Sequence, residues 1–343
     1  MKAAVLYGIH DLRLEERPRP SPAADEVLVR IKAVGVCGSD LHFYHEGHIG
    51  DKVVERPYVL GHEAAGEVVE VGADVKAYKV GDRVCLEPGI PCRKCAWDKR
   101  GEYNLCPHGV YQSGPHTDGF FQEYTAIPAD YVFPLPDNLD WIDGALIEPF
   151  VVGLHATWRA NVQPGASVAI LGAGPIGLMT LAAAQAHGAT TTIVADVIEK
   201  RLSLARELGA THALNAREVK TVDEVQRLTG GIGADVVFET AGAIPTQQQS
   251  VWAARRGGTV VLVGMPGESV IPLDTMRVIR AELSVKGSFR YANHFPKAID
   301  LSASGRFNLR PIATHTFPLE QIGEAFETSL TKKDVAIKVV VTI

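Results

Sequence analysis

Residues 171–177 read LGAGPIG, and this stretch decides the fold. Gly172, Gly174 and Gly177 stand in G-x-G-x-x-G spacing, after the apolar run SVAIL and before the helical pattern PIGLMTLAAAQAHG. In this setting Gly172 permits a tight turn, Gly174 lets the backbone approach a pyrophosphate, and Gly177 lets helix and strand pack closely. Free N–H groups at the helix start face the phosphates, so the stretch predicts a dinucleotide-binding turn.

An acid follows at the end of the next predicted strand. Asp196 closes the run TTIVAD, where a carboxylate accepts hydrogen bonds from both hydroxyls of an adenosine ribose. Its charge repels a 2′-phosphate, which favours NAD over NADP. Arg201 follows within the next helical pattern, and an arginine near this position can receive that phosphate. Both residues therefore belong to the predicted cofactor site.

Working outward, strand and helix patterns alternate. TTIVADV, ADVVFETAG and TVVLVGMPG predict strands, and IEKRLSLARELG and IPTQQQSVWAARRGG predict helices. Repeated strand–helix–strand units predict an α/β domain, a doubly wound parallel Rossmann sheet, which we place at residues 150–287. Ligands lie beyond the carboxyl ends of such strands. We therefore expect the nicotinamide half at Val263, Gly264 and Met265, with Ile176 covering the dinucleotide.

The rest of the chain has a different sequence pattern. Up to about residue 150 it is β-rich, with short apolar runs broken by Gly, Asp and Pro. Residues 88–118 are dense in Pro, Cys, Gly and charge, which predicts a separate lobe. The final run AIKVVVTI predicts a strand that returns to the first domain. We therefore expect residues 1–149 and 288–343 to form one catalytic domain.

Bulk properties exclude several classes of protein. The 343 residues carry a formal net charge of −6 with scattered basic residues, which does not suggest nucleic-acid binding. Apolar runs are too short to span a bilayer, and the N-terminus does not resemble a signal peptide. The five cysteines are odd in number, which argues against a disulfide framework and favours a reducing compartment with thiolates free for metal.

One candidate metal site is local in sequence. Two cysteines two residues apart can clip a zinc ion, a third can return to it, and a carboxylate can complete the set. The predicted structural zinc ligands are Cys92, Cys95, Asp98 and Cys106. Such a site would stabilise a lobe that has no core of its own. The alternative is three free thiols beside a solvated Asp98.

A second cluster of candidate ligands is spread along the chain. Residues 36–48, VCGSDLHFYHEGH, combine one cysteine with three histidines. His62 and Glu63 lie in GHE, and Glu148 lies in LIEP. Periodicity cannot bring these residues together, and each has an ordinary explanation as a hydrogen-bonded or solvated side chain.

Six stretches occur along the chain in the following order: VCGSDLH, PYVLGHEAAGEVVEVG, VGDRV, LIEP, LGAGPIGL and KGSFRY. Together they resemble the zinc-containing medium-chain dehydrogenases, most closely the polyol dehydrogenases of the sorbitol, xylitol and iditol type. The resemblance covers essentially the whole chain. It implies a GroES-like β-rich catalytic domain beside the Rossmann domain. It also implies hydride transfer from a secondary alcohol of a polyol to NAD, giving a ketose.

The resemblance assigns roles to the scattered residues. It implies that Cys37, His62 and Glu63 bind a catalytic zinc ion and that Glu148 approaches the zinc-bound water. In related alcohol dehydrogenases the acid matching Glu148 is itself the ligand, so either acid can be the direct one. Ser39 and His42 match a proton relay, and Glu148 offers a second proton route through water. His45 and His48 match no role, and loop solvation is the expectation for both.

Substrate and nicotinamide contacts follow from the same resemblance. Arg290 and Tyr291 of KGSFRY match residues that hold further hydroxyls of a polyol, and Ser288 and Phe289 are candidate backbone contacts to the nicotinamide. Sorbitol dehydrogenases commonly carry a substrate-contacting Tyr where this chain has Phe43. Phe120 and Phe121 can wall the pocket or pack in the core.

Two other hypotheses about the function remain. A threonine or 2,3-butanediol dehydrogenase has the same fold, and a catalytically inert nucleotide-binding or structural protein could have kept the fold without the chemistry. The joint presence of Cys37, His62, Glu63, Ser39 and His42 argues against an inert protein. The resemblance also implies a homotetramer in the cytoplasm, acting on a small molecule without nucleic-acid or membrane partners.

Overall fold

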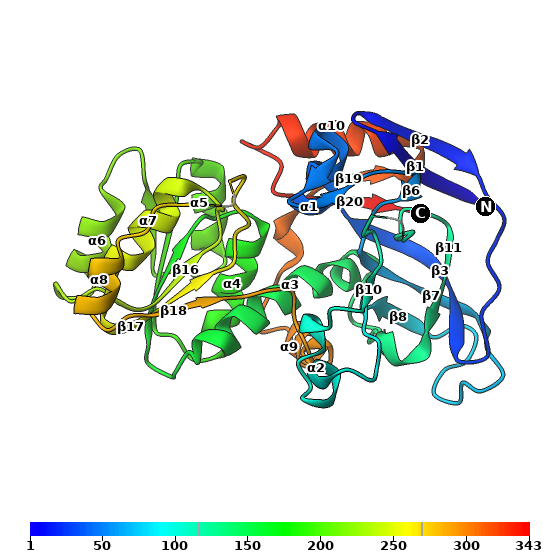
Figure 1. Ribbon diagram of the computed structural model, residues 1–343, viewed down its shortest axis with the longest axis horizontal. Helices are drawn as coiled ribbons and strands as arrows, with labels where there is room; N and C mark the ends of the chain where they lie inside the picture. Colours follow the sequence, from blue (N-terminus) through cyan, green and yellow to red (C-terminus); the bar gives the residue numbers. More distant parts are fainter. Residues whose placement is uncertain (116, 269) are drawn as a thin grey trace. The chain divides into compact units, whose positions relative to one another are not determined.

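The computed structural model describes residues 1–115, 117–268 and 270–343. Contacts within the chain define two compact units (Figure 1). Unit 1 contains Met1–Glu148, Phe295–Arg306 and Ala313–Ile343, and unit 2 contains Pro149–His294 and Phe307–Ile312. The predicted bounds differ at residues 149, 288–294 and 307–312, which cluster with unit 2.

Unit 2 is built on a six-stranded parallel sheet in the order β15-β14-β13-β16-β17-β18. The order reverses at β13, which is the doubly wound arrangement with the ligand crevice at the reversal point. The strands are β13 (Ser167–Leu171), β14 (Thr191–Asp196), β15 (His212–Asn215), β16 (Ala234–Glu239), β17 (Ala254–Leu262) and β18 (Ser284–Gly287). The prediction of a Rossmann sheet is confirmed.

Helices connect these parallel strands, as right-handed crossovers require. They are α4 (Pro175–Ala186), α5 (Glu199–Glu207), α6 (Thr221–Leu228), α7 (Ile244–Ala253) and α8 (Thr275–Arg280). Helix α4 packs on β13 and β14, and α7 packs on β16 and β17 with α6 and α8 beside it. Alanines and valines such as Ala169, Val237 and Val260 fill the core between the layers.

Unit 1 is β-rich and antiparallel in the main. Its largest sheet runs β12-β8-β7-β3-β20-β19, with β11 also paired to β3, and a second sheet runs β2-β1-β6. The strands are β1 (Lys2–Gly8), β2 (Asp11–Glu16), β3 (Glu26–Gly35), β4 (His48–Ile49), β5 (Lys52–Val53), β6 (Tyr58–Val59), β7 (Glu63–Val71), β8 (Arg83–Leu86), β9 (Gly89–Ile90), β10 (Val110–Tyr111), β11 (Tyr124–Pro128), β12 (Val132–Pro134), β19 (Ala313–Pro318) and β20 (Lys338–Thr342).

The last strand, β20, lies between β3 and β19, so the predicted return of the C-terminus to the first domain is confirmed. The unit also holds α1 (Gly38–Glu46), α2 (Ala96–Lys99), α9 (Phe295–Ala303) and α10 (Ile322–Thr331), and the boundary between the units falls within α3 (Trp141–Ala160). Phe120 and Phe121 are fully buried in the core of unit 1, as the core-packing alternative predicts.

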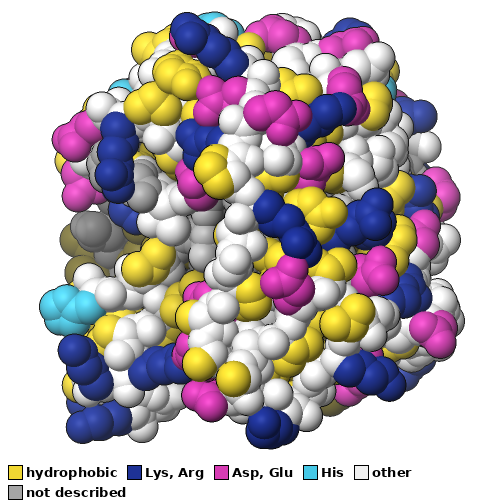
Figure 2. All heavy atoms as spheres, turned by 90° about the vertical axis from the view of Figure 1, so that its right-hand side faces the viewer, with side chains coloured by type: hydrophobic (Ala, Val, Ile, Leu, Met, Phe, Trp, Pro, Cys, Tyr) yellow, Lys and Arg dark blue, Asp and Glu magenta, His cyan; other side chains and the backbone are white. Residues whose placement is uncertain are grey.

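The surface gives two further observations. None of the helices in the described ranges combines the length and the apolar composition needed to cross a bilayer. The face drawn in Figure 2 carries basic and acidic side chains interspersed, rather than one field of a single sign.

Candidate active site and metal sites

Cys37 is positioned by the helix that follows it. It is the N-cap of α1, and its backbone N–H donates to Oδ2 of Asp40 at 3.0 Å. Asp40 is three residues into the helix, which is the capping-box position, so the carboxylate satisfies a backbone donor that the helix leaves free. The histidine-rich stretch of residues 36–48 therefore contains a helix start, and Cys37 stands at this capped end.

The register of two strands brings the other two ligands to this cysteine. Glu63 begins β7 and pairs with Gly35 at the end of β3, two residues before Cys37. His62 precedes Glu63 and is buried, as Glu63 is. Ligand atoms of Cys37, His62 and Glu63 all lie within 4.8 Å of one another. Thiolate, imidazole and carboxylate with this spacing form a donor set that fits zinc and leaves a fourth position open.

Asp40 also orients the histidine. Its Oδ1 lies 3.4 Å from His62 Nδ1 and accepts a hydrogen bond from Ser113 Oγ at 2.8 Å. Burial pulls the pKa of Asp40 upward, but His62 and these hydrogen bonds outweigh it and hold the pKa below its usual range. Such a carboxylate fixes the ring so that the opposite nitrogen faces a metal.

Glu63 is held by a lysine that sequence reasoning missed. Nζ of Lys338 donates to Oε1 and Oε2 of Glu63 at 2.7 and 2.8 Å, and both side chains are buried. Burial lowers the pKa of Lys338, yet the charges of Glu63 and Cys37 reverse this and raise it. The ammonium therefore stays charged beside the carboxylate. A lysine inside the apolar run AIKVVVTI is the sequence signal that could have found it.

Glu148 lies in α3 near this group. It is 5% exposed, and Tyr111 Oη donates to its Oε1 at 3.4 Å. The Tyr111 ring stands 5.4 Å from the His62 ring, centroid to centroid. A further acid, Glu87, is buried; burial raises its pKa to about 8, and the charge of Glu148 adds to the rise. Glu87 and Tyr111 were also missed by sequence reasoning.

The residues matched to a proton relay lie on α1. Ser39 and His42 are half-buried, and His42 Nδ1 lies 2.9 Å from Oε1 of Glu46. Phe43 is buried in the core of unit 1 against Tyr58.

The two unmatched histidines differ from each other. His45 is not in a loop: it lies in α1, and its Nδ1 meets His10 Nε2 at 2.8 Å, so loop solvation is wrong for it. The helix explains the difference, because it presents the exposed His45 to the β1–β2 turn. His48 is exposed and begins the short strand β4.

The cysteine lobe brings its four predicted ligands together. Ligand atoms of Cys92, Cys95, Asp98 and Cys106 all lie within 4.8 Å of one another. Desolvation pulls the pKa of Asp98 upward, but hydrogen bonds from Cys92 and Cys95 outweigh it and lower the pKa to about 2. Its Oδ2 accepts from Cys95 N at 3.0 Å, while Oδ1 is buried without a partner among the described residues. A buried spare oxygen and three sulfurs fit a closed zinc site.

The glycine turn of unit 2 has the expected geometry. Gly172 has a φ of 111°, which favours glycine, and a Cβ on Gly177 would stand 1.9 Å from the Gly172 carbonyl oxygen. A Cβ on Gly174 would meet nothing within 4 Å, so space there is open to a ligand. Asp196 Oδ2 accepts from Ala173 N at 2.7 Å, and Arg201 Nη1 stands 3.8 Å from the same oxygen.

The other predicted cofactor and substrate residues of unit 2 lie around the ends of β13, β17 and β18. Ile176 and Val263 are half-buried, and Gly264 follows β17, with the exposed Met265 next to it. Residues 288–291 follow β18, and the backbone N–H of Ser288 donates to the carbonyl oxygen of Leu262 at 3.0 Å. Phe289 is exposed, and the Arg290 guanidinium stands over its ring at 4.8 Å from the centroid. Tyr291 is buried.

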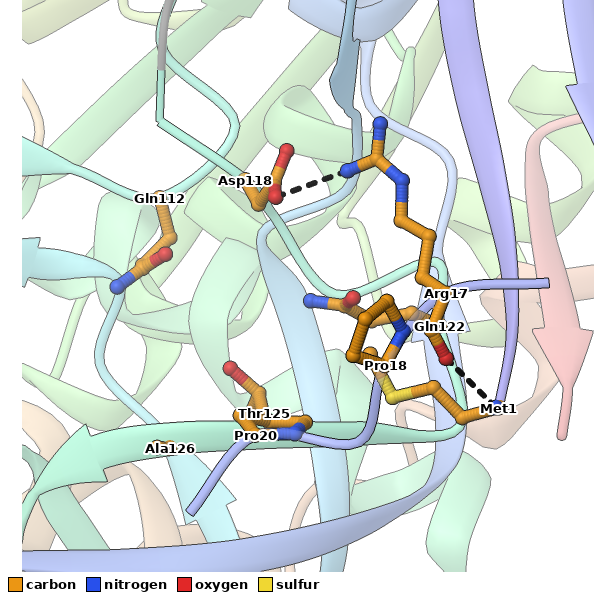
Figure 3. Close-up of a pocket in the computed structure, with 9 residues that line it drawn as sticks. All are labelled: Met1, Arg17, Pro18, Pro20, Gln112, Asp118, Gln122, Thr125 and Ala126. Carbon is orange, nitrogen blue, oxygen red and sulfur yellow. Dashed lines mark hydrogen bonds and ion pairs between the residues drawn. The ribbon is translucent and has the colours of Figure 1, made fainter. Parts of the chain in front are cut away.

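A cavity of about 490 Å³ opens elsewhere in unit 1 (Figure 3). Arg17 and Asp118 form an ion pair at 3.0 Å beside it, and Met1 N donates to Arg17 O at 2.8 Å. None of its nine lining residues belongs to either ligand group: Met1, Arg17, Pro18, Pro20, Gln112, Asp118, Gln122, Thr125 and Ala126.

Comparison with known proteins decides the family. The profile described as "Alcohol dehydrogenase GroES-like domain" matches residues 23–137, and "Zinc-binding dehydrogenase" matches residues 175–304. Sorbitol dehydrogenase of Bacillus subtilis (strain 168) is 45% identical over 341 residues, which cover 99% of this chain and 97% of that protein. The chain belongs to the zinc-dependent medium-chain dehydrogenases of the polyol type. The resemblance seen in the sequence is thereby confirmed, and with it the GroES-like and Rossmann fold class.

Solved structures of this dehydrogenase family agree over the full length. L-idonate 5-dehydrogenase from Escherichia coli has a TM-score of 0.93 at 30% identity, covering 100% of this chain and 98% of that one. 2R,3R-butanediol dehydrogenase from Bacillus subtilis has a TM-score of 0.91 at 32% identity, covering 100% and 99%. The protein is an oxidoreductase that acts on the CH–OH group of an alcohol.

Proposed function

We propose that this dehydrogenase oxidises a secondary alcohol of a polyol of the sorbitol, xylitol or L-iditol class to the ketose, with NAD as the hydride acceptor. The observation that carries the proposal is the meeting of Cys37, His62 and Glu63 within 4.8 Å. The sorbitol dehydrogenase relative, at 45% identity, supports a polyol as substrate.

The proposal assigns metal ligands as follows. Cys37, His62 and Glu63 hold a catalytic zinc ion, and Glu148 stands beside it. The group of atoms within 4.8 Å includes Glu63 and does not include Glu148 among the described residues, which supports Glu63 as the direct ligand. A second, structural zinc ion is held by Cys92, Cys95, Asp98 and Cys106.

Zinc supplies a Lewis acid when bound, and NAD supplies the hydride acceptor. The chain's own residues hold and move the proton that the alcohol loses. Asp40 fixes the ring of His62, and Tyr111 orients Glu148 through its 3.4 Å hydrogen bond. Ser39 and His42 offer one proton route, which ends at the half-exposed Glu46, and Glu148 offers another.

In this proposal unit 2 binds NAD. Gly172, Gly174 and Gly177 hold the pyrophosphate with Ile176 over it, and Asp196 receives the ribose hydroxyls. Arg201 faces Asp196 at 3.8 Å, so its charge is directed to that acid, which supports NAD over NADP. The nicotinamide is assigned to Val263, Gly264, Met265, Ser288 and Phe289.

The proposal assigns recognition of further polyol hydroxyls to Arg290 and Tyr291, which belong to unit 2. In unit 1, Phe43 stands where sorbitol dehydrogenases commonly carry a tyrosine, and the missing hydroxyl shifts the preference among polyols. We also propose that the enzyme is a cytoplasmic homotetramer, which sedimentation and cell fractionation would test.

A substrate screen tests the function. Sorbitol, xylitol, ribitol, galactitol, threonine and 2,3-butanediol are each offered with NAD and NADP, with NADH or NADPH absorbance as the readout and Cys37→Ser and Glu63→Gln alongside. We expect polyols with NAD to give the highest kcat/KM and both variants to lose activity. Preference for butanediol or threonine would support the other readings of this fold, and full activity of Cys37→Ser would overturn the site.

A further inference from the structure

The position of Lys338 relative to Glu63 goes beyond these roles. Its Nζ lies 2.7 and 2.8 Å from the two oxygens of one carboxylate. An ammonium almost equidistant from both oxygens lies on the plane that passes midway between them and sits against both at hydrogen-bond distance. A metal that binds both oxygens at once must also lie midway between them, in competition with this ammonium. Lys338 therefore leaves each oxygen of Glu63 its outer lone pair, and because these two lone pairs point in opposite directions, one metal ion can use only one of them.

The lysine is fixed in this position by the sheet. Val340 pairs with Gly35, and Gly35 pairs with Glu63. The register of β20, β3 and β7 therefore fixes where these residues lie relative to one another. Lys338 stands two residues before Val340, on the same face of β20. Its third N–H donates to the carbonyl oxygen of Val36 at 3.1 Å, so all three donors are used.

The other side of the carboxylate is also closed. A Cβ on Gly35 would stand 2.0 Å from Oε2 of Glu63, so the backbone of β3 already lies against that oxygen. Glu63 is 0% exposed and Lys338 is 2% exposed. The carboxylate cannot turn away from the ammonium without losing a buried, charge-assisted pair.

The charges of the site give the arrangement a second consequence. A thiolate at Cys37 and a carboxylate at Glu63 together cancel the charge of a divalent cation. The ammonium of Lys338 restores one positive charge within hydrogen-bond distance of one ligand, in a buried region where charges are poorly screened. A site with residual positive charge is the stronger Lewis acid.

We propose that Lys338 is a positioning residue of the catalytic metal site, which restricts Glu63 to one metal-bound oxygen and keeps the fourth coordination position open. This inference rests on the proposed zinc site and concerns how that site is tuned. Two protein oxygens from Glu63 would fill the position that the substrate oxygen needs.

Cobalt(II) substitution tests the proposal, because its visible absorption reports coordination number independently of turnover. The variants are Lys338→Met, Lys338→Arg and, as a matched control, Lys2→Met, which removes an exposed lysine paired with Glu320 at 2.6 Å. We expect Lys338→Met to lower the cobalt absorption by roughly half or more, as a fifth ligand atom does. We expect kcat to fall about tenfold or more while KM changes less than about threefold. Lys338→Arg should recover most of the cobalt absorption and most of kcat, and Lys2→Met should change neither of these quantities.

A double-mutant cycle keeps the test decisive if Lys338→Met folds poorly. Replacing both partners, with Glu63→Gln and Lys338→Met together, removes the buried ion pair without leaving one charge alone. If Lys338 acts through Glu63, the double variant matches Glu63→Gln within about twofold in cobalt absorption and kcat. An equal loss from Lys338→Met in both backgrounds, or an unchanged cobalt spectrum in Lys338→Met, would overturn the proposal. A wild-type protein that binds cobalt but oxidises no polyol would reject the proposed substrate and leave the role of Lys338 standing.

Discussion

At the scale of single residues, Gly35 sets the position of the metal-binding carboxylate. A Cβ there would stand 2.0 Å from Oε2 of Glu63, and neither the strand backbone nor the buried acid can move freely. We expect Gly35→Ala to cost about 1–3 kcal/mol of stability and to lower kcat/KM on the order of 100-fold. Gly323→Ala in α10 is the control, because its Cβ meets nothing within 4 Å. Normal zinc content and activity in Gly35→Ala would show that Gly35 does not set the position of the Glu63 carboxylate.

His155 gives a residue-scale prediction in unit 2. It is 4% exposed and stacks on Trp158, and burial, with the charges of His294 and Arg159, lowers its pKa to about 4. Since an unfolded histidine titrates near 6.5, the unfolded chain binds the extra proton between pH 4 and 6.5. Stability therefore falls as pH drops through this window, by at most about 3 kcal/mol from this residue.

His155→Asn removes that titration. Urea midpoints measured from pH 7 to 4 should fall less steeply in the variant than in the wild type. Parallel pH profiles for the two proteins would show that His155 does not carry the effect.

Individual ligands could be inferred from the sequence far better than their supports. Cys37, His62 and Glu63 stand in recognisable motifs, whereas Asp40 and Lys338 do not. Asp40 is detectable in principle, because Cys37-x-x-Asp40 has the spacing of a capping box, as Cys95-x-x-Asp98 has. Lys338 depends on the register of three strands, which no local pattern specifies.

At the scale of elements, the glycine turn separates a folding role from a binding role. A Cβ on Gly177 would stand 1.9 Å from the Gly172 carbonyl, whereas a Cβ on Gly174 would meet open space. We expect Gly177→Ala to destabilise unit 2 by about 1–3 kcal/mol. We expect Gly174→Ala to fold normally and weaken NADH binding at least about tenfold, roughly 1.4 kcal/mol. Calorimetric titration and thermal melting distinguish the two, and equal melting temperatures would refute the assignment.

The cysteine lobe is the element that depends most on metal. Every residue of α2 and of the turn at Tyr103–Leu105 is at least partly exposed, so apolar burial contributes little there. Removal of zinc by a chelator should make residues 92–106 sensitive to protease. Asp98→Ala should weaken zinc retention by more than the ten- to hundredfold that loss of an outer partner costs. Unchanged zinc content in Asp98→Ala would show that Asp98 only caps α2.

Elements with strong periodicity were predictable, and short ones were not. The patterns for β13, α4 and β14 match the observed strands and helix to within three residues at each end. Strand β17 begins at Ala254 rather than at Thr259, because Ala254 pairs with Ala234 before a register shift. Helix α1 escaped notice because its histidines and acids give it no apolar face, and capping and packing of Phe43 and Tyr44 stabilise it instead.

At the scale of the whole molecule, the alternation of strand and helix patterns predicts two domains but does not predict the residues at which the chain passes from one to the other. The chain stays with unit 2 through His294, because β18 continues the parallel sheet and Ser288 N bonds Leu262 O. A sixth parallel strand of four residues carries too little pattern to be recognised from the sequence.

Each unit has its own core, one centred on residues such as Val29 and Phe121 and the other on Ala169 and Val260. A ligand that binds one folded unit stabilises that unit first. We expect NADH at about 100 times its Kd to stabilise unit 2 by about 2.7 kcal/mol. Hydrogen exchange should then slow in peptides of β13, β14 and β16 more than in those of β3, β7 and β20. Chelation of zinc should speed exchange in the second group and leave the first unchanged. Gly174→Ala provides the control, since NADH at the same concentration should protect its unit 2 less. Equal protection of both groups by NADH would mean that the two cores unfold as one cooperative body.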